Sequence, residues 1–249
     1  MKKIIAAAFA TTGFMVGLAA TSTNTSPAGS PVEIKHPWRS SISAGLTLTR
    51  GNKNTTLFTA DFSTQKKSAT DEFMLGLGGA YGQQDGRDSV NNYKAQVQWN
   101  HLFSERFFGY LRAEGLQDRI KDIDYRLTIG PGAGYYLIKG TNTTLAAEAG
   151  VGFEAQRLGD ADENFATLRV ADRFEHRFGE RARLWQSVEF SPQADRLENF
   201  VVNFEIGLET SITKSFSQKT YLVETFANRP AAGRTKNDVK LVAGLAYKF

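Results

Sequence analysis

The sequence predicts an all-β protein, a transmembrane antiparallel β-barrel of about 12 strands preceded by a cleaved signal peptide. Three observations predict it. Between residues 38 and 249, apolar and polar side chains alternate with a period of two in segment after segment, and no window shows a sustained helical stripe. Many of these segments exceed ~10 residues, which is longer than most strands of soluble sheets and long enough for a tilted crossing of a bilayer. The last segment ends the chain on an aromatic residue, Phe249.

The expected strands are separated by breaks rich in Gly, Asn, Asp and Lys. In chain order they span roughly 38–50, 54–66, 71–82, 91–103, 106–118, 123–137, 142–156, 163–178, 181–192, 198–212, 217–229 and 235–249. An even number of strands puts both ends of the chain on one side, which we expect to be the periplasm. The breaks predict short periplasmic turns that alternate with longer external loops at 83–90, 157–162, 192–197 and 230–234.

Residues 1–20 have the features of a secretory signal peptide. Lys2 and Lys3 precede an apolar run over 4–20 that ends in small residues. A transmembrane anchor is the alternative, but polar residues and a glycine interrupt the run at 11–13, and its length barely reaches the ~17 residues that a span needs. We therefore expect secretion across the inner membrane.

Residues 21–37 are rich in Ser, Thr, Asn and Pro and predict a flexible periplasmic lead-in, so the barrel domain covers 38–249. Removal of Lys2 and Lys3 leaves 28 basic residues (30 − 2) against 26 acidic ones. This near-neutral balance gives no argument for a nucleic-acid partner. The chain has no cysteine, which excludes disulfides and thiolate metal sites, and we expect neither a cofactor nor a metal.

The faces of the expected strands differ in a way that favours a membrane barrel. In the last strand one face is apolar, and the other carries small or charged residues such as Lys240 and Gly244. Elsewhere the faces opposite the apolar ones carry glycines and carboxylates, which do not make a dry core. A two-layer sandwich would turn such faces to water, but strand length and the signal peptide argue against it. The apolar faces, expected to contact lipid, include Phe73, Leu75, Leu77 and Tyr81; Tyr125, Leu127, Ile129 and Tyr135; Leu145, Val151 and Phe153; Phe200, Val202, Phe204 and Ile206; and Val239, Leu241 and Leu245.

Aromatic residues gather toward the two ends of the expected strands, which predicts two interfacial girdles. The girdle at the periplasmic end is expected to contain Trp38, Trp99, Phe103, Phe107, Phe108, Tyr135, Phe174, Phe178, Tyr221 and Phe249. The other girdle is expected to contain Tyr81, Tyr93, Tyr125, Phe165, Phe190, Phe200 and Phe226.

The polar faces place a nearly balanced set of charges inside the barrel. One hypothesis is that these charges pair across the lumen and fill it. The other is that they line a path for small solutes, with charge setting selectivity. Glycines on the same faces leave space that either water or neighbouring side chains can occupy. The residues expected to line the lumen are Lys94, Arg112, Glu114, Arg126, Glu148, Glu154, Arg169, Arg173, Glu189, Glu205, Glu209 and Lys240, with Asp238 beside them.

Two stretches resemble a known family. Trp38–Asn52 (WRSSISAGLTLTRGN) and Asp124–Tyr135 (DYRLTIGPGAGY) are similar to the YdiY-like family of salt-induced outer-membrane proteins, a family of unknown function. The resemblance covers essentially the whole mature chain, and it implies an outer-membrane barrel with a link to salt or osmotic conditions. It supplies no catalytic residues. Separately, Tyr247 and Phe249 resemble the C-terminal signal that the bacterial barrel-insertion machinery recognises.

The expected function is therefore a narrow passive channel for small solutes or ions in the outer membrane, in contact with lipid and lipopolysaccharide. The first alternative is a structural envelope protein with a charge-plugged lumen. The second is an outer-membrane lipid hydrolase. His101 is followed three residues later by Ser104, but two-residue spacing is needed to place both side chains on one strand face. We therefore expect no enzymatic activity and assign His101 to the aromatic rim.

Overall fold

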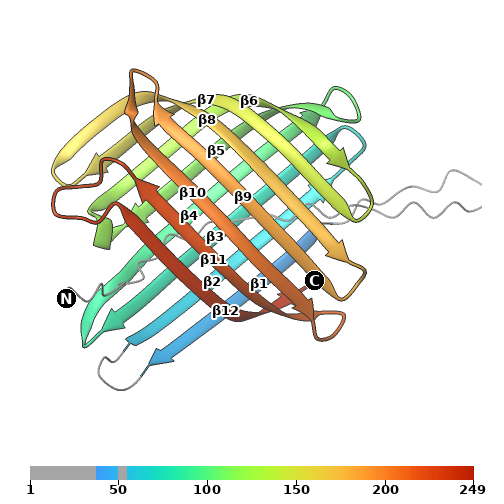
Figure 1. Ribbon diagram of the computed structural model, residues 1–249, viewed down its shortest axis with the longest axis horizontal. Helices are drawn as coiled ribbons and strands as arrows, with labels where there is room; N and C mark the ends of the chain where they lie inside the picture. Colours follow the sequence, from blue (N-terminus) through green and yellow to red (C-terminus); the bar gives the residue numbers. More distant parts are fainter. Residues whose placement is uncertain (1–37, 50–54) are drawn as a thin grey trace, which may run out of the picture.

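The computed structural model describes residues 38–49 and 55–249, which form a single β-barrel (Figure 1). The signal peptide and lead-in predicted for 1–37 lie outside the described residues. The strands agree with the predicted segments to within a few residues and confirm the fold class. They are β1 (Arg39–Thr49), β2 (Thr55–Lys67), β3 (Asp71–Gln84), β4 (Arg87–Leu102), β5 (Phe107–Asp118), β6 (Ile123–Lys139), β7 (Thr143–Leu158), β8 (Ala161–Phe178), β9 (Ala182–Gln193), β10 (Arg196–Ser211), β11 (Phe216–Ala227) and β12 (Asn237–Lys248), with a short 3-10 helix η1 (Arg119–Lys121) between β5 and β6.

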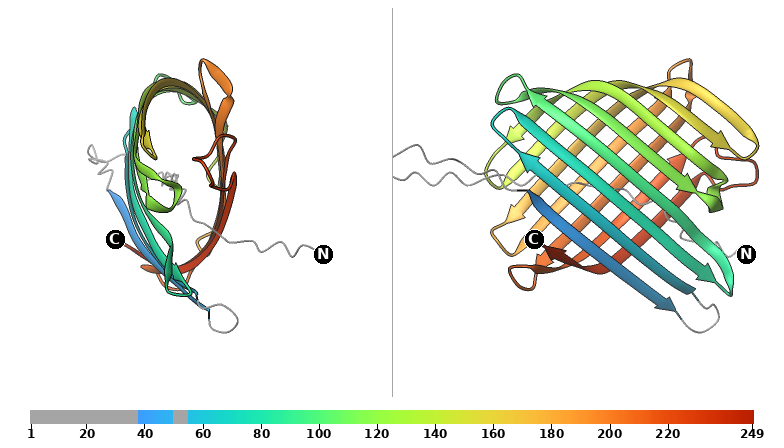
Figure 2. Two further views of the ribbon diagram at one scale, coloured as in Figure 1. Left: turned by 90° about the vertical axis from the view of Figure 1, so that its left-hand side faces the viewer. Right: turned by 180° about the vertical axis from the view of Figure 1, so that it is seen from behind.

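Each strand pairs antiparallel with its neighbours in the chain, and β12 returns to β1 to close the ring. The closing pair is in register from Ser41 opposite Lys248 to Gly45 opposite Gly244. Ser40 and Phe249 add two backbone hydrogen bonds across the same seam, of 3.1 and 3.0 Å. Seen along the barrel, the ring is flattened into an ellipse (Figure 2). Opposite walls of the lumen are therefore close enough for side chains to meet.

The outer surface is apolar, as the two-residue alternation predicted. On β12, Leu241 and Leu245 are 63% and 57% exposed, while Lys240 and Val242, on either side of Leu241, are buried. The same alternation holds on β6 and β7, where Leu127, Ile129 and Val151 are exposed. Exposed aliphatic side chains on every second residue of a closed ring match a lipid-facing surface. Among the described residues, no helix is long and apolar enough to cross a membrane.

Three aromatic residues expected in the two girdles, Phe108, Tyr221 and Phe165, face the lumen instead. Phe108 is 0% and Tyr221 7% exposed, and both belong to buried clusters in the lumen. Phe107, the neighbour of Phe108, is exposed on the outer face, as is Phe216 at the start of β11. Because side chains alternate along a strand, Phe108 must point to the other face of the sheet from Phe107. Grouping the aromatic residues by strand end was therefore not enough to assign them to the inner or the outer face.

At the end of the barrel away from the chain termini, which was predicted to be external and is called external below, three of the loops are shorter than expected. The strands continue beyond the expected breaks and are joined by two-residue turns, such as Asp85 and Gly86 between β3 and β4, with φ of 51° and 79°. Positive φ at both positions matches the twist of the paired strands, and Asp-Gly is a preferred sequence for it. Gly159 makes a similar turn between β7 and β8, with φ of 60°. The connection between β11 and β12, residues 228–236, remains long.

Candidate functional site

The inner face of the barrel carries the charges that the sequence assigned to it. All twelve predicted lumen residues have buried or half-buried side chains on the interior side of their strands, and ten of them form ion pairs. The ion-paired residues are Lys94, Arg112, Glu114, Arg126, Glu148, Glu154, Arg169, Arg173, Glu189 and Glu209. The other two, Glu205 and Lys240, are 4% and 2% exposed.

Glu148 is the centre of the largest group of pairs. Its side chain is 0% exposed and accepts hydrogen bonds from Arg169 Nη1 at 2.8 Å and from Arg173 Nη2. Arg169 also donates through Nε to Glu189 at 2.7 Å and through Nη1 to the Tyr110 hydroxyl at 3.0 Å. These residues are called the Glu148 network below. Buried side chains can remain charged here because each has a partner of the opposite charge.

The pairs continue toward the external end of the barrel. Arg112 contacts Glu114 at 2.6 Å and Glu189 at 3.7 Å, which joins it to the Glu148 network. Lys94 shares Glu114 at 3.1 Å. Farther out, Arg126 and Glu154 form a separate pair. The charged side chains of the lumen thus form ion pairs with one another and do not form rings of a single sign.

A second group of pairs lies near the chain termini, and of its members only Glu209 was predicted to line the lumen. Arg183 binds both Glu175 and Glu209, at 3.3 and 2.8 Å, and Lys248 and Ser217 also contact Glu209. Neither Arg183 nor Glu175 was predicted to face the lumen. The signal was present, because Arg183 lies in phase with Glu189 on β9 and Glu175 with Arg173 on β8.

Glu72 on β3 was missed as well. It is 4% exposed and lies 3.1 Å from Lys67. Tyr136 Oη donates to Glu72 Oε2 at 2.8 Å, and Asn100 Nδ2 donates to the same oxygen at 3.1 Å. Lys67 and Glu72 both lie at strand ends, where the sequence pattern does not distinguish residues of the lumen from residues of the rim.

Aromatic side chains occupy the space that inner-wall glycines leave. Phe108 packs over Gly134 so closely that a Cβ there would come within 2.2 Å of its ring. Trp185 covers Gly207 in the same way, at 2.1 Å. The Phe108 cluster is completed by Met74, Tyr110, Tyr136 and Ala146. The glycines therefore admit neighbouring rings in the half of the lumen near the termini, rather than widening it.

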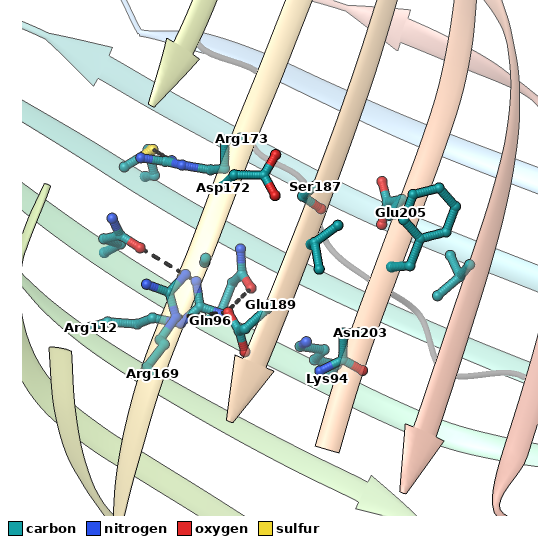
Figure 3. A pocket seen from close by; sticks show the side chains of 16 residues that line it. Lys94, Gln96, Arg112, Arg169, Asp172, Arg173, Ser187, Glu189, Asn203 and Glu205 are labelled. Atoms are coloured by element: carbon teal, nitrogen blue, oxygen red, sulfur yellow. Dashed lines mark hydrogen bonds and ion pairs between the residues drawn. The ribbon is translucent and has the colours of Figure 1, made fainter. Parts of the chain in front are cut away.

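The external half of the lumen is open. It contains a cavity of about 380 Å³, called the vestibule below, whose lining includes Lys121, Arg126, Glu154, Glu163, Arg234 and Asp238. Beneath it lies an inner pocket of about 70 Å³. Lys94, Arg112, Arg169, Glu189 and Asn203 line both spaces. In Figure 3, Arg112 and Arg169 lie on the left of the inner pocket, and Glu205 and Asn203 on the right.

Two connections border the mouth of the vestibule. Asp118 caps η1 by accepting hydrogen bonds from the backbone N–H groups of Ile120 and Lys121. Asp122, which follows η1, accepts two hydrogen bonds from Arg234 in the 228–236 loop, at 2.8 and 2.7 Å. Lys121 forms an ion pair with Asp238. The β5–β6 connection is thus tied to the β11–β12 loop across the mouth.

Comparison with known proteins adds a family to this geometry. Residues 42–249 match the family described as "Protein of unknown function, DUF481". The chain belongs to this family. A comparison with functionally curated proteins finds no matching sequence.

The fold of this DUF481 barrel is shared with solved outer-membrane structures. It is similar to the NanC porin with a TM-score of 0.52 and 7% identity, over 85% of this chain and 100% of that one. It is also similar to an outer membrane channel from Pseudomonas putida F1, with a TM-score of 0.51 and 9% identity, over 89% and 100% of the two chains. At these identities the likeness concerns the fold. Together with the apolar outer surface, it places the chain in the bacterial outer membrane.

The predicted rim residues of the DUF481 barrel lie on its outer face near the termini. His101 Nδ1 is 3.1 Å from Asp71 Oδ1, and the imidazole packs edge-on against Phe103 at 5.1 Å. Ser104 Oγ accepts hydrogen bonds from the backbone N–H groups of Arg106 and Phe107, which close the β4–β5 turn. Tyr247 and Phe249 stack at 5.8 Å beside the closing seam.

Proposed function

We propose that this barrel is a narrow passive channel for small solutes or ions. One observation carries the proposal. The vestibule and the inner pocket share five polar or charged lining residues, so a polar space extends from the external mouth to the middle of the lumen. A barrel of this size falls between small barrels whose interior is filled by side chains and large porins with an open aqueous channel. Such a lumen favours small solutes over large ones.

Conductance of the purified protein in a planar lipid bilayer tests this proposal. We expect small discrete current steps, because only a narrow route remains beside the paired charges. Glu205→Gln is an informative variant, since Glu205 is one of the two predicted lumen residues that form no ion pair, and glutamine keeps the shape of the side chain. Steps whose ion preference differs between the two proteins support the channel. An absence of steps in both contradicts it.

A structural envelope protein is the second candidate, and the filled half of the lumen favours it. Glu148 is fully enclosed between two arginines, and the Phe108 cluster occupies the lumen nearby. If these groups seal the barrel, the protein stiffens the membrane without conducting. The same bilayer recording separates the two candidates.

The link to salt or osmotic conditions is also a proposal, supported by the resemblance to the YdiY-like family. Transcript and protein levels in cells grown at low and high salt test it. We further propose that the outward belt contacts membrane lipid, that the external rim contacts lipopolysaccharide, and that the insertion machinery recognises Tyr247 and Phe249. Deletion of Phe249 is expected to lower the amount of folded barrel in the outer membrane.

We propose that the chain is not an enzyme. The engagement of Ser104 in a turn and of His101 with Asp71 supports this, because neither side chain is placed to activate the other. Phospholipid hydrolysis by the purified barrel that disappears in His101→Ala would overturn it.

A further inference from the structure

Buried polar atoms without partners are concentrated on one lateral row of the sheet. The row runs from Arg173 on β8 through Ser187 and Glu205 to Val223 and Lys240 on β12. Within the described residues, Arg173 Nε, Glu205 Oε2 and Lys240 Nζ are buried and make no hydrogen bond. Buried polar groups in proteins are nearly always hydrogen-bonded, so three exceptions on one row call for a physical reason.

Two further atoms of this kind lie on β2. They are Asp61 Oδ1 and Gln65 Oε1, four residues apart on the same inner face. The other oxygen of Asp61 accepts a hydrogen bond from the Tyr221 hydroxyl at 3.2 Å. Lys240 interacts electrostatically with both Asp61 and Glu205. The β2 atoms and the row on β8–β12 therefore belong to one region of the lumen.

This region continues from the inner pocket. Arg173, Glu205 and Val223 line that pocket, whose volume of about 70 Å³ exceeds the ~10–15 Å³ that a cavity needs to hold one water molecule. Both carboxylate oxygens of Glu148, by contrast, accept hydrogen bonds from arginines. Unsatisfied polar atoms thus lead away from the inner pocket toward β2, and the Glu148 network offers fewer free hydrogen-bonding groups to a passing ion.

We propose that small ions leave the inner pocket along a polar track between β2, β10 and β12, lined by Glu205, Lys240 and Asp61, and that Lys240 sets the preference between anions and cations. This inference rests on the proposed channel function. The free atoms on the track replace part of the hydration of a passing ion, which is how selectivity sites act at close quarters. Gln65 lies two residues before the C-terminal end of β2, and its Oε1 is the last of these unpaired atoms before the periplasmic rim.

Lys240 differs from Lys94, another lysine of the lumen, in the field that it presents. Lys94 lies 3.1 Å from Glu114, so its charge is largely cancelled at a distance. Lys240 is 2% exposed, and no ion pair among the described residues includes it. Asp61 and Glu205 lie in its field but form no direct ion pair with it, so the charge of Lys240 can act on an ion in the track, in surroundings with a lower dielectric constant than water.

Ion selectivity in a KCl gradient tests the role of Lys240. We expect Lys240→Gln to raise the K⁺/Cl⁻ permeability ratio several-fold. Asp61→Asn should lower the same ratio. The matched control is Lys94→Gln, which removes one positive charge on β4 while Glu114 keeps Arg112 as a partner. An equal or larger shift in the control than in Lys240→Gln overturns the proposal.

Thiol labelling tests the track without requiring conductance. The chain has no cysteine, so a single substitution is the only reactive site. Ser43 Oγ lies 3.4 Å from Asp61 on the proposed track, whereas Ser217 is 0% exposed against Glu209. Both Ser→Cys changes are nearly isosteric, and retained β circular dichroism shows that the variants fold.

We expect a small charged methanethiosulfonate reagent to add its mass to the folded Ser43→Cys protein and to leave Ser217→Cys unmodified. Ser217 is the second residue of β11, near the periplasmic rim, so reactivity controlled by depth alone gives the opposite order. Protection of Ser43→Cys, or equal labelling of both, overturns the track. Labelling of Ser43→Cys in a protein without current steps refutes the channel function while retaining a hydrated track.

Discussion

In the external half of the lumen, charged side chains line an open vestibule of about 380 Å³, whereas in the half near the termini they are enclosed among aromatic rings. Arg126 and Glu154 in the vestibule keep 21% and 14% of their side-chain surface exposed. Glu148 keeps 0%. The same kinds of residues thus occupy two different environments. The count of charges is therefore a poor guide to where a barrel is open.

The difference between the halves comes from aromatic residues and glycines on facing strands. Phe108 and Trp185 enter the lumen over Gly134 and Gly207 and form the buried clusters of that half. The vestibule lacks such a cluster within the described residues and is instead bordered by η1 and the 228–236 loop. Enclosed pairs depend on both partners being present, while exposed pairs contribute little.

Removal of the Glu148 carboxylate is expected to have the largest effect. Glu148→Gln leaves Arg169 and Arg173 buried without that counter-charge, which should lower the free energy of unfolding by about 3–5 kcal/mol. Urea unfolding in lipid vesicles, followed by tryptophan fluorescence, measures this loss. The control is Glu154→Gln in the vestibule, where we expect about 1 kcal/mol or less because the pair is more hydrated. Equal losses in the two variants would refute the distinction between the halves.

Filling a glycine site in the enclosed half is expected to have an intermediate effect. A Cβ at Gly207 would lie 2.1 Å from the Trp185 ring, so Gly207→Ala should displace the indole and cost about 1–3 kcal/mol. Trp185 Nε1 would also lose its 2.7 Å hydrogen bond to Glu205, and a shift of the tryptophan emission spectrum reports this. Gly115→Ala is the control, because its Cβ would meet only a flexible leucine side chain at 3.4 Å. A stable Gly207→Ala with unchanged emission would show that the ring is not held there.

Loss of the contact across the mouth is expected to have the smallest effect. Asp122→Asn keeps a residue that tolerates the φ of 56° but removes the charge that Arg234 binds. Because both side chains are about 40% exposed, we expect less than about 1 kcal/mol in stability. Amide hydrogen exchange in residues 228–236 should become faster, and raising the salt concentration should produce the same change in the wild type. If neither Asp122→Asn nor raised salt changes the exchange rates, the ion pair between Asp122 and Arg234 does not restrain the loop.

Much of the fold followed from the sequence because strand alternation is a local property. Side chains on successive residues point to opposite faces whatever the neighbours are, so the outward position of Leu241 and the inward position of Lys240 were set by counting from Phe249. The same counting located Glu148 and Arg169 on the inner face. It failed for Phe108 and Tyr221, where grouping by strand end replaced the count, and for turns such as Asp85-Gly86, where the strands continued farther than expected.

By itself, the sequence determined the strands, their two faces, and hence a barrel with a charged interior and an apolar exterior. Only the tertiary structure decided which charges meet and which half of the lumen is filled. Contacts such as Tyr221 with Asp61, 160 residues apart, depend on how far the ring flattens and how its walls approach. That distance is a property of the closed sheet as a whole, and no local pattern of residues encodes it.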